Sequence, residues 1–441
     1  MGFFINAVSL TDLEGEKPVV KNEKRQRVDN QPYGHTDYVI RKALYPEGHP
    51  YNWTVIGELE DLQNATLEDV KEFYDKWYGP NNATLVIAGD FKSDEVKPMV
   101  EKYFGEIPSR GEDVPMEPKP VTLDETKVLY YEDNFAQLPE MRMTFPSVEN
   151  YHEDQWALDA LQEILTDGKR APLYKVLVEQ AEVAPESGVS AFHSSNELAG
   201  TFTIRIRANK GVDLDTVRTL VFDALDKFEH EGFSQKDLER IKARQETNFY
   251  NGISSVFNKS LQLAFYNEYA GDPGYITQDI ENIKSVTKED VMRVYQKYIK
   301  GKNHIVTNFV PKGEPMLALE GAVAADVKEE DVTAYQPSET LEQEGDFVIE
   351  KTPSSFDRTV EPDFGEEPLV TPPVIWTAQT SNGMDVYGIE RDELPLVQFS
   401  FRVMGGLYLD DPDKIGAANM ITDLMMEGTA NKTPEELEDA I

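Results

Sequence analysis

The chain has 441 residues, of which 40% are hydrophobic, and this is enough to form the buried cores of roughly three globular domains. Asp and Glu number 81 against 43 Lys and Arg, so the net charge of −38 argues against nucleic acid or an anionic membrane as a partner. The lack of cysteine excludes disulfides, thiol nucleophiles and cysteine-bound metals.

The sequence contains no apolar run long enough to span a membrane, so we expect no membrane insertion. The first ten residues, MGFFINAVSL, carry no basic leader region. Either the protein is cytosolic, or a segment that directs it elsewhere lies outside this chain.

Residues 16–31 read EKPVVKNEKRQRVDNQ and place two carboxylates, Glu16 and Glu23, seven positions apart. This spacing is about two helical turns, so both side chains would share one face of a helix. Pro18 complicates this expectation, because proline either begins a helix or kinks it. The six histidines of the chain form no H-E-x-x-H or H-x-x-E-H motif, so the chain alone cannot complete a histidine-based zinc site.

Two stretches, 65–90 and 286–310, share one pattern. Each begins with a threonine cap and an aspartate three residues later, continues as an amphipathic helix with aromatic residues, and ends in a turn and a β-branched strand. The caps are Thr66 with Asp69 and Thr287 with Asp290. They lie 221 positions apart, which is too far for a solenoid repeat and suits a duplicated domain.

The region between these stretches mixes strands with pairs of helices. We expect strands within 127–147 and at 200–208, and helices at 154–165, 171–181, 214–231 and 234–250. This mixture predicts an α+β domain with a largely antiparallel sheet. In the strand 200–208, Phe202, Ile204 and Ile206 would face the core, whereas Thr203, Arg205 and Arg207 share the other face. The two arginines are expected to face solvent, with the lining of a ligand chamber as the alternative.

Residues 314–373 contain sixteen acidic and three basic residues with several prolines, so this segment is expected to be an extended linker. Strands are expected to resume at 384–390 and 396–404. A third threonine cap, Thr433 with Glu436, begins another helix near the end of the chain.

The sequence, most clearly in its first 110 residues, resembles the pitrilysin/insulysin zinc metallopeptidases, or inverzincins, which include the mitochondrial processing peptidases. The matching text is VVKNEKRQRVDNQPYG at 19–34, ALYPEGHPYNWTVIGELEDL at 43–62, and the helix and strand at 65–90. The resemblance implies an α+β fold of repeated domains, each a mainly antiparallel sheet flanked by helices, truncated here at both ends.

The same resemblance divides the chain into four parts. They are the C-terminal part of a first peptidase domain (1–110), a second, non-catalytic domain (120–312), an acidic hinge linker (313–373) and the start of a third domain that begins a degenerate second half (374–441). Where that third domain should carry H-x-x-E-H, this chain has Asn419 to Asp423, with neither histidine nor glutamate. The same residues would also suit an ordinary amphipathic helix that buries Met420, Ile421 and Leu424.

In this family zinc is held by the two histidines of H-x-x-E-H and by a glutamate on a later helix. The resemblance assigns that later glutamate to Glu23 and a supporting role beside a histidine to Glu16. Such a set leaves one coordination position for a water that the metal activates. The H-x-x-E-H motif would lie about 70 to 80 residues before Glu23, upstream of Met1. We therefore expect one Zn²⁺ per active half, but weak or no zinc binding and no hydrolysis by this chain alone.

Other conspicuous side chains are expected to be structural. His35 and His49 lie near Glu23 in sequence, but the family uses neither as a ligand, so packing or turn roles are expected. The aromatic residues Trp53, Trp77 and Tyr78 are expected in a core.

Three hypotheses remain open. In the first, the chain is a portion of a zinc metalloendopeptidase that hydrolyses peptides or unfolded small proteins, with two homologous halves enclosing a chamber and substrate added to a sheet edge. In the second, it is a non-catalytic structural or peptide-binding member of the family. In the third, it is a product that truly starts at Met1, which would leave unpaired sheet edges. A periplasmic or other extracytoplasmic location is implied by bacterial relatives and by the lack of cysteine.

Overall fold

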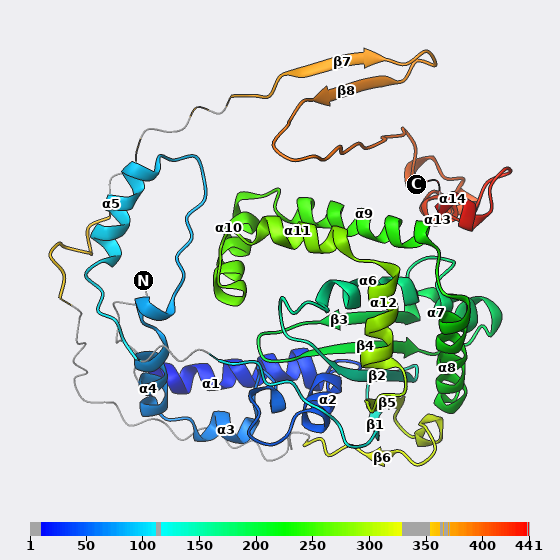
Figure 1. Ribbon diagram of the computed structural model, residues 1–441, viewed down its shortest axis with the longest axis horizontal. Coiled ribbons are helices and arrows are strands. Elements are labelled where there is room, and N and C mark those ends of the chain that lie inside the picture. Colours follow the sequence, from blue (N-terminus) through cyan, green and yellow to red (C-terminus); the bar gives the residue numbers. More distant parts are fainter. Residues whose placement is uncertain are drawn as a thin grey trace.

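The computed structural model describes residues 10–111, 116–328, 353–361, 365, 369, 371–438 and 440, with the side chains of 10–14 left aside. Its centre is a six-stranded sheet in the order β3-β4-β2-β5-β1-β6 (Figure 1). The strands are β1 (Lys127–Asp133), β2 (Glu140–Ser147), β3 (Val189–Ser194), β4 (Gly200–Arg207), β5 (Ile305–Pro311) and β6 (Val323–Ala324). The pairs β3-β4, β4-β2 and β2-β5 are antiparallel, while β1 runs parallel to β5 and β6, so the sheet is mixed with an antiparallel majority.

One face of the sheet is apolar and is covered by helices. Met141, Met143 and Phe145 of β2 lie opposite Ile206, Ile204 and Phe202 of β4, and all six side chains are buried. Helix α6 (Gln155–Thr166) packs on β3, and α12 (Lys288–Val294) and α9 (Gln235–Gly252) pack on α6. The inward positions expected for β4 are therefore confirmed, since alternate residues of a strand point to one face.

Helix α8 (Leu214–Glu231) and the pair formed by α7 (Pro172–Tyr174) and the π-turn η5 (Lys175–Gln180) match their expected positions, and η8 (Tyr295–Ile299) continues the helix expected after Thr287. The sequence did not predict α10 (Val256–Phe265), η7 (Tyr266–Ala270) and α11 (Ile276–Ser285). Among the described helices, none has the length and hydrophobicity that a membrane crossing requires.

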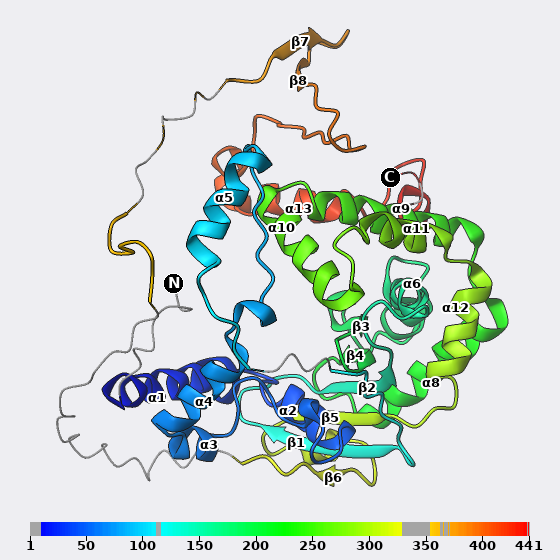
Figure 2. The same ribbon diagram turned by 60° about the vertical axis from the view of Figure 1, so that its left-hand side comes forward.

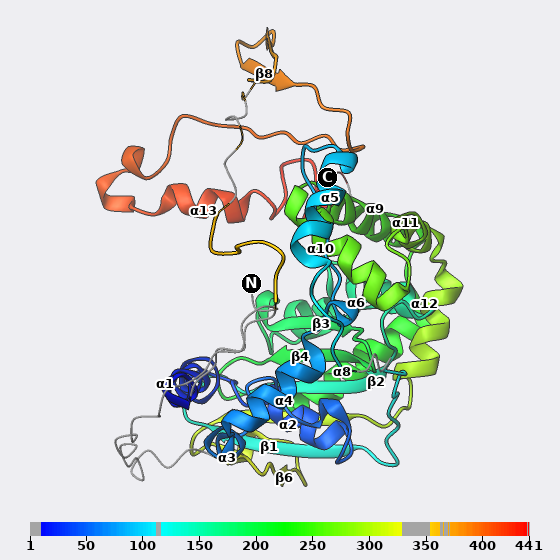
Figure 3. The same ribbon diagram turned by 90° about the vertical axis from the view of Figure 1, so that its left-hand side faces the viewer.

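The opposite face of the sheet is polar and carries Glu140 and Arg142 on β2 and Arg205 and Arg207 on β4. Helix α2 (Thr36–Leu44) packs against this face at β5, where Leu44 and Tyr45 meet Ile305. Figure 3 shows α2 on the side of the sheet away from α6 and α12. A segment more than a hundred positions upstream thus covers part of a face that the strand pattern assigns to solvent.

The three expected threonine caps are all present. Thr66 caps α4 (Leu67–Trp77) and Thr287 caps α12, each with the reciprocal backbone contacts of a capping box. At α14 (Pro434–Glu438), Thr433 Oγ accepts from the Glu436 N–H at 3.2 Å, and the Glu436 carboxylate accepts from the Thr433 N–H at 2.9 Å. The strand expected after α4, at 83–88, does not form, whereas its counterpart β5 lies inside the sheet.

The first part of the expected linker packs on the sheet instead of extending away from it. Leu317 and Leu319 are buried, and β6 pairs with β1. Most of the rest, from 329 to 352, lies outside the described residues. A chain rich in acids can still contribute a short buried stretch where two leucines meet an apolar surface.

The C-terminal segment forms a hairpin and short helices that stand apart from the sheet (Figure 2). The hairpin is β7 (Ile375–Gln379) with β8 (Asp385–Ile389), and the second expected strand, 396–404, does not form. Helix α13 (Ala417–Leu424) contains Asn419 to Asp423, so the helix expected there is present. Its side chains Met420, Ile421 and Leu424 are nevertheless all exposed. The burial expected for these three side chains is wrong in the described structure, because no described element covers them.

Candidate functional site

Helix α1 (Leu10–Lys24) continues through Gly15 and Pro18 without a break and leads into the π-turn η2 (Arg25–Asp29). Glu16 and Glu23 therefore lie on one helix, as their spacing predicts. Two turns separate them by ~10 Å along the axis. Zinc needs oxygen ligands at about 2 Å, so the two carboxylates cannot share one ion.

Glu23 lies near the end of α1 with its side chain 41% exposed, and its carboxylate is 3.2 Å from Arg27 Nη1, one turn further on. Glu16 is exposed. The described residues contain no cluster of three or more His, Asp or Glu side chains that could hold a metal ion. They therefore do not fit a zinc ion by themselves, and Glu23 offers at most one ligand.

The two histidines near Glu23 in sequence serve packing roles. His49 is buried and stacks on Tyr45, its Nδ1 accepts from the Tyr51 N–H at 3.0 Å, and its Nε2 lies 3.0 Å from the Lys119 carbonyl. His35 is buried edge-on against Tyr131. The structural roles expected for both residues are confirmed.

A cavity of about 440 Å³ lies between the polar face of the sheet and the segment formed by α2 and η3 (Pro50–Asn52). Its α2 wall includes Asp37 and Arg41, whose side chains pair at 2.8 Å. Its sheet wall includes Arg142, Thr144, Phe192 and Thr203. We call this cavity the sheet pocket.

The aromatic side chain Trp53 lines the sheet pocket and is 49% exposed, and Tyr78 is exposed as well. Trp77 is half-buried. The expectation that these residues form a core is therefore wrong for Trp53 and Tyr78, because the segments that carry them lie at the surface of the described structure.

A second cavity of about 220 Å³ adjoins the sheet pocket. It is lined by Lys24 at the end of α1 and Val28 of η2, and it shares Asp37 and Val55 with the sheet pocket. The two cavities together outline a groove that runs from Lys24, the residue after Glu23, along α2 to the sheet, although Glu23 itself lines neither cavity. No sequence motif predicts this groove, because its walls come from separate segments.

The arginines expected to face solvent are partly buried. Glu140, itself buried, accepts from Arg142 Nε at 2.8 Å and from Arg207 Nε and Nη2 at 3.0 and 2.7 Å. The guanidinium of Arg207 also lies 4.0 Å from the centre of the Tyr33 ring. The polar face is therefore an ion-pair network under the N-terminal segments and not a free surface.

Three residues from three elements form a Ser-His-Asp series that the sequence did not reveal. His193 Nδ1 lies 2.7 Å from Asp159 Oδ1, and His193 Nε2 lies 3.1 Å from Ser147 Oγ. Ser147 is buried, the His193 side chain has no exposed surface, and neither lines any of the described cavities we located. A nucleophile must reach its substrate, so this series joins β2, β3 and α6 as a structural contact.

We therefore expect a fluorophosphonate probe, which labels active serine hydrolases, to leave the folded protein unlabelled. A serine hydrolase in the same tube serves as the positive control. Labelling that disappears in Ser147→Ala would contradict the structural role.

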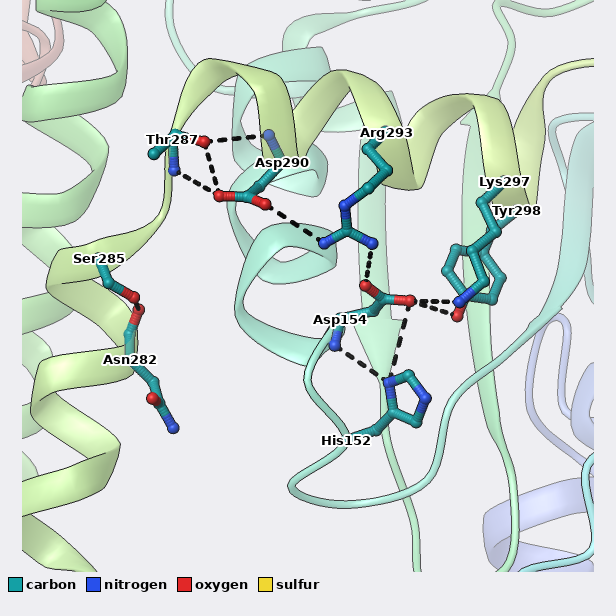
Figure 4. A network of polar contacts seen from close by, with 9 residues as sticks. All are labelled: His152, Asp154, Asn282, Ser285, Thr287, Asp290, Arg293, Lys297 and Tyr298. Carbon is teal, nitrogen blue, oxygen red and sulfur yellow. Dashed lines mark hydrogen bonds and ion pairs between the residues drawn. The ribbon is translucent and has the colours of Figure 1, made fainter.

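A second buried network joins the start of α6 to α12 and η8 (Figure 4). Asp154 has no exposed side-chain surface, and its carboxylate pairs with Arg293 and accepts from Lys297 Nζ at 2.7 Å and Tyr298 Oη at 2.6 Å. Burial alone would raise the pKa of Asp154, but these three donors outweigh it and hold the pKa at about 2. The carboxylate is fully engaged, so this network stabilises the fold.

The sequence of this chain is similar to a known family model and to known proteins. Residues 64–245 match a family model described as "Peptidase M16 inactive domain". The chain is 27% identical to "Zinc protease PqqE" of Helicobacter pylori over 290 residues, covering 65% of this chain and 64% of that protein. It is 23% identical to "Probable inactive metalloprotease YmfF" of Bacillus subtilis over 259 residues, 56% of this chain and 57% of that protein.

Solved structures of peptidases have a similar fold. A protease from Helicobacter pylori superposes with a TM-score of 0.62 at 25% identity, covering 69% of this chain and 73% of that one. The periplasmic protease PqqL from Escherichia coli superposes with a TM-score of 0.55 at 16% identity, covering 69% of this chain and 33% of that one, and this likeness shows the fold alone. The chain thus spans about two thirds of PqqE and about one third of PqqL.

Proposed function

Because the chain belongs to the M16 family of pitrilysin-like peptidases, we propose that it is a portion of a zinc-dependent metalloendopeptidase that hydrolyses peptides or unfolded small proteins. Relatives named zinc proteases support zinc as the metal of the family. The observation that carries the proposal is the groove between the end of α1 and the sheet, since it begins at Lys24, next to Glu23, and includes a cavity of about 440 Å³ that can take peptide side chains.

In this proposal Glu23 is one ligand of a zinc ion whose other ligands lie outside the described residues. The partly exposed carboxylate and its i,i+4 ion pair with Arg27 support that role, because a surface pair of this kind is worth only about 0.3–0.5 kcal/mol and is easily exchanged for a metal. Glu16 supports a histidine ligand from two turns away. When bound, the metal supplies Lewis acidity and an activated water.

The proposal also includes the four-part division at 1–110, 120–312, 313–373 and 374–441, with duplicated domains and two homologous halves around a chamber. The paired capping-box helices α4 and α12 support the duplication. Peptides are the proposed partners. A periplasmic or other extracytoplasmic location is part of the same proposal.

In the gene product at its natural length, Glu23→Gln is expected to lose both bound zinc and zinc-dependent peptide hydrolysis. Zinc content is measured by elemental analysis and hydrolysis with a quenched fluorescent peptide. The matched control is Glu72→Gln, an exposed glutamate of α4. Unchanged zinc content in Glu23→Gln would contradict the ligand role, and robust zinc-dependent turnover by residues 1–441 alone would contradict the need for ligands from elsewhere.

A second candidate function is a non-catalytic, structural or peptide-binding member of the family. The match to a model described as an inactive domain and the likeness to a probable inactive metalloprotease favour it. Peptide binding without any zinc-dependent hydrolysis by the natural-length protein would select this candidate.

A further inference from the structure

Four residues form one row across the polar face of the sheet, one from each of four adjacent strands. Ser190 of β3 lies opposite Arg205 of β4, Arg205 lies opposite Arg142 of β2, and Arg142 lies opposite Thr307 of β5. We call this set the arginine row. Side chains that oppose each other across a sheet have Cβ atoms about 5 Å apart, so two guanidinium groups stand side by side within it.

Three of these four residues carry a buried polar atom without a hydrogen-bond partner among the described residues. These atoms are Ser190 Oγ, Arg205 Nε and Thr307 Oγ1. Buried polar atoms in native proteins are nearly always satisfied by protein, water or a bound group. Their concentration in one row therefore indicates that something polar occupies this place.

The positive charge of the row favours an anion as the partner of these atoms. Glu140 is the carboxylate within this network, and its oxygens already accept from Arg142 and Arg207. Arg205 lies opposite Arg142 and two residues before Arg207 on β4. Burial lowers the pKa of Arg205, as does repulsion from these two cations, although Glu140 partly opposes this. Like charges directly opposed on a sheet are destabilising, so an added anion would relieve the row.

The sheet pocket reaches the row at Arg142, the one member of the row that lines it. The next residues on the same face of β2 and β4, Thr144 and Thr203, share a hydrogen bond at 3.1 Å and line the pocket too. Its other walls include Tyr51, Trp53 and Phe192, which offer apolar contact to a peptide.

We infer that the arginine row is a carboxylate-binding subsite, which holds an acidic side chain or the C-terminal carboxylate of a peptide lying in the sheet pocket. The planar, forked guanidinium matches a carboxylate with two parallel hydrogen bonds. Arg142, which lines the sheet pocket, donates to the carboxylate, and Arg205, opposite it on β4, adds its positive charge from behind. That the ligand is a peptide rests on the proposed function, but the carboxylate subsite needs neither Glu23 nor hydrolysis.

The test is calorimetric titration of the chain with short synthetic peptides in the presence of EDTA. Four otherwise uncharged peptides are compared: one with an internal Glu, one with Gln in its place, and one each with a free and an amidated C-terminus. A carboxylate-bearing peptide is expected to bind about tenfold more tightly than its neutral counterpart. The pair that shows the difference identifies the source of the carboxylate, and added salt is expected to reduce it.

Arg205→Gln is expected to remove this preference while leaving the melting temperature unchanged or raising it, because it removes a repelling charge that has no hydrogen-bond partner at Nε. The matched control is Arg218→Gln, an arginine of α8 that pairs with Asp215 away from the pocket, and it should keep the preference.

Equal binding of acidic and neutral peptides by the unchanged protein would overturn the inference, as would a preference that survives in Arg205→Gln. Both readouts are made without metal, so they remain separate from any failure of zinc-dependent hydrolysis. Binding of neutral peptides alone would keep the proposed groove and reject the carboxylate subsite.

Discussion

Glu140→Gln is expected to lower the free energy of unfolding by about 4 kcal/mol, because it removes the carboxylate that pairs with two partly buried arginines. The Arg142 and Arg207 side chains are only 20% and 36% exposed, so they cannot turn fully into water when their partner is lost. The amide of Gln keeps one acceptor but brings an N–H₂ group toward guanidinium donors. Urea denaturation of both proteins measures the difference.

A double-mutant cycle with Arg205→Gln separates the sources of this loss. Arg205 makes no hydrogen bond to Glu140 among the described residues but shares its electrostatic environment. The double variant Glu140→Gln/Arg205→Gln is therefore expected to recover about 1 kcal/mol of the loss, since one repelling charge is gone. Strictly additive effects would show that repulsion within the arginine row is negligible.

Asp154→Asn is expected to cost about 3 kcal/mol, because it leaves Lys297 and Arg293 facing an amide in place of a buried carboxylate. The expected loss is smaller than for Glu140, since Arg293 and Lys297 are 46% and 49% exposed and can partly turn to solvent. Asp223→Asn, an exposed residue of α8, is the matched control and should change stability by less than about 0.5 kcal/mol.

The Asp154 carboxylate is expected to make the free energy of unfolding depend on pH. Its pKa is about 2 in the folded protein against an ordinary value of 3.8, so the unfolded chain takes up this proton at higher pH than the folded one. The contribution of about 2 kcal/mol is complete above about pH 4 and disappears as the pH falls from about 4 to about 2. Asp154→Asn should lose this part of the pH profile, and a profile equal to that of the unchanged protein would contradict the assignment.

Local sequence signals were sufficient to predict an element where residues at its two ends cap or stop it. Helix α8 begins after Asp213, whose side chain caps it, and ends before Gly232, whose φ of +68° stops a helix and suits glycine. The alternation of Phe202, Ile204 and Ile206 likewise identified the buried face of β4 without knowledge of the fold.

Local signals failed where distant segments decide the outcome. Period-two alternation correctly placed Arg205 and Arg207 on one face, but it could not show that residues 33–45 fold back over that face. The series Ser147, His193 and Asp159 combines three elements and has no motif. Pro18 was an ambiguous signal, and the helix accommodates it at the loss of one backbone hydrogen bond.

The arginine row is positively charged, whereas the whole chain has a net charge of −38. This difference affects the rate at which an acidic peptide associates with the protein. An acidic peptide is repelled at long range and attracted only once it enters the groove. Added salt screens the long-range repulsion, since the Debye length is about 10 Å at 0.1 M, so the association rate constant should rise while the complex dissociates faster. The acidic surface would thus lower the association rate constant of an acidic peptide, and the arginines would lower its dissociation rate constant.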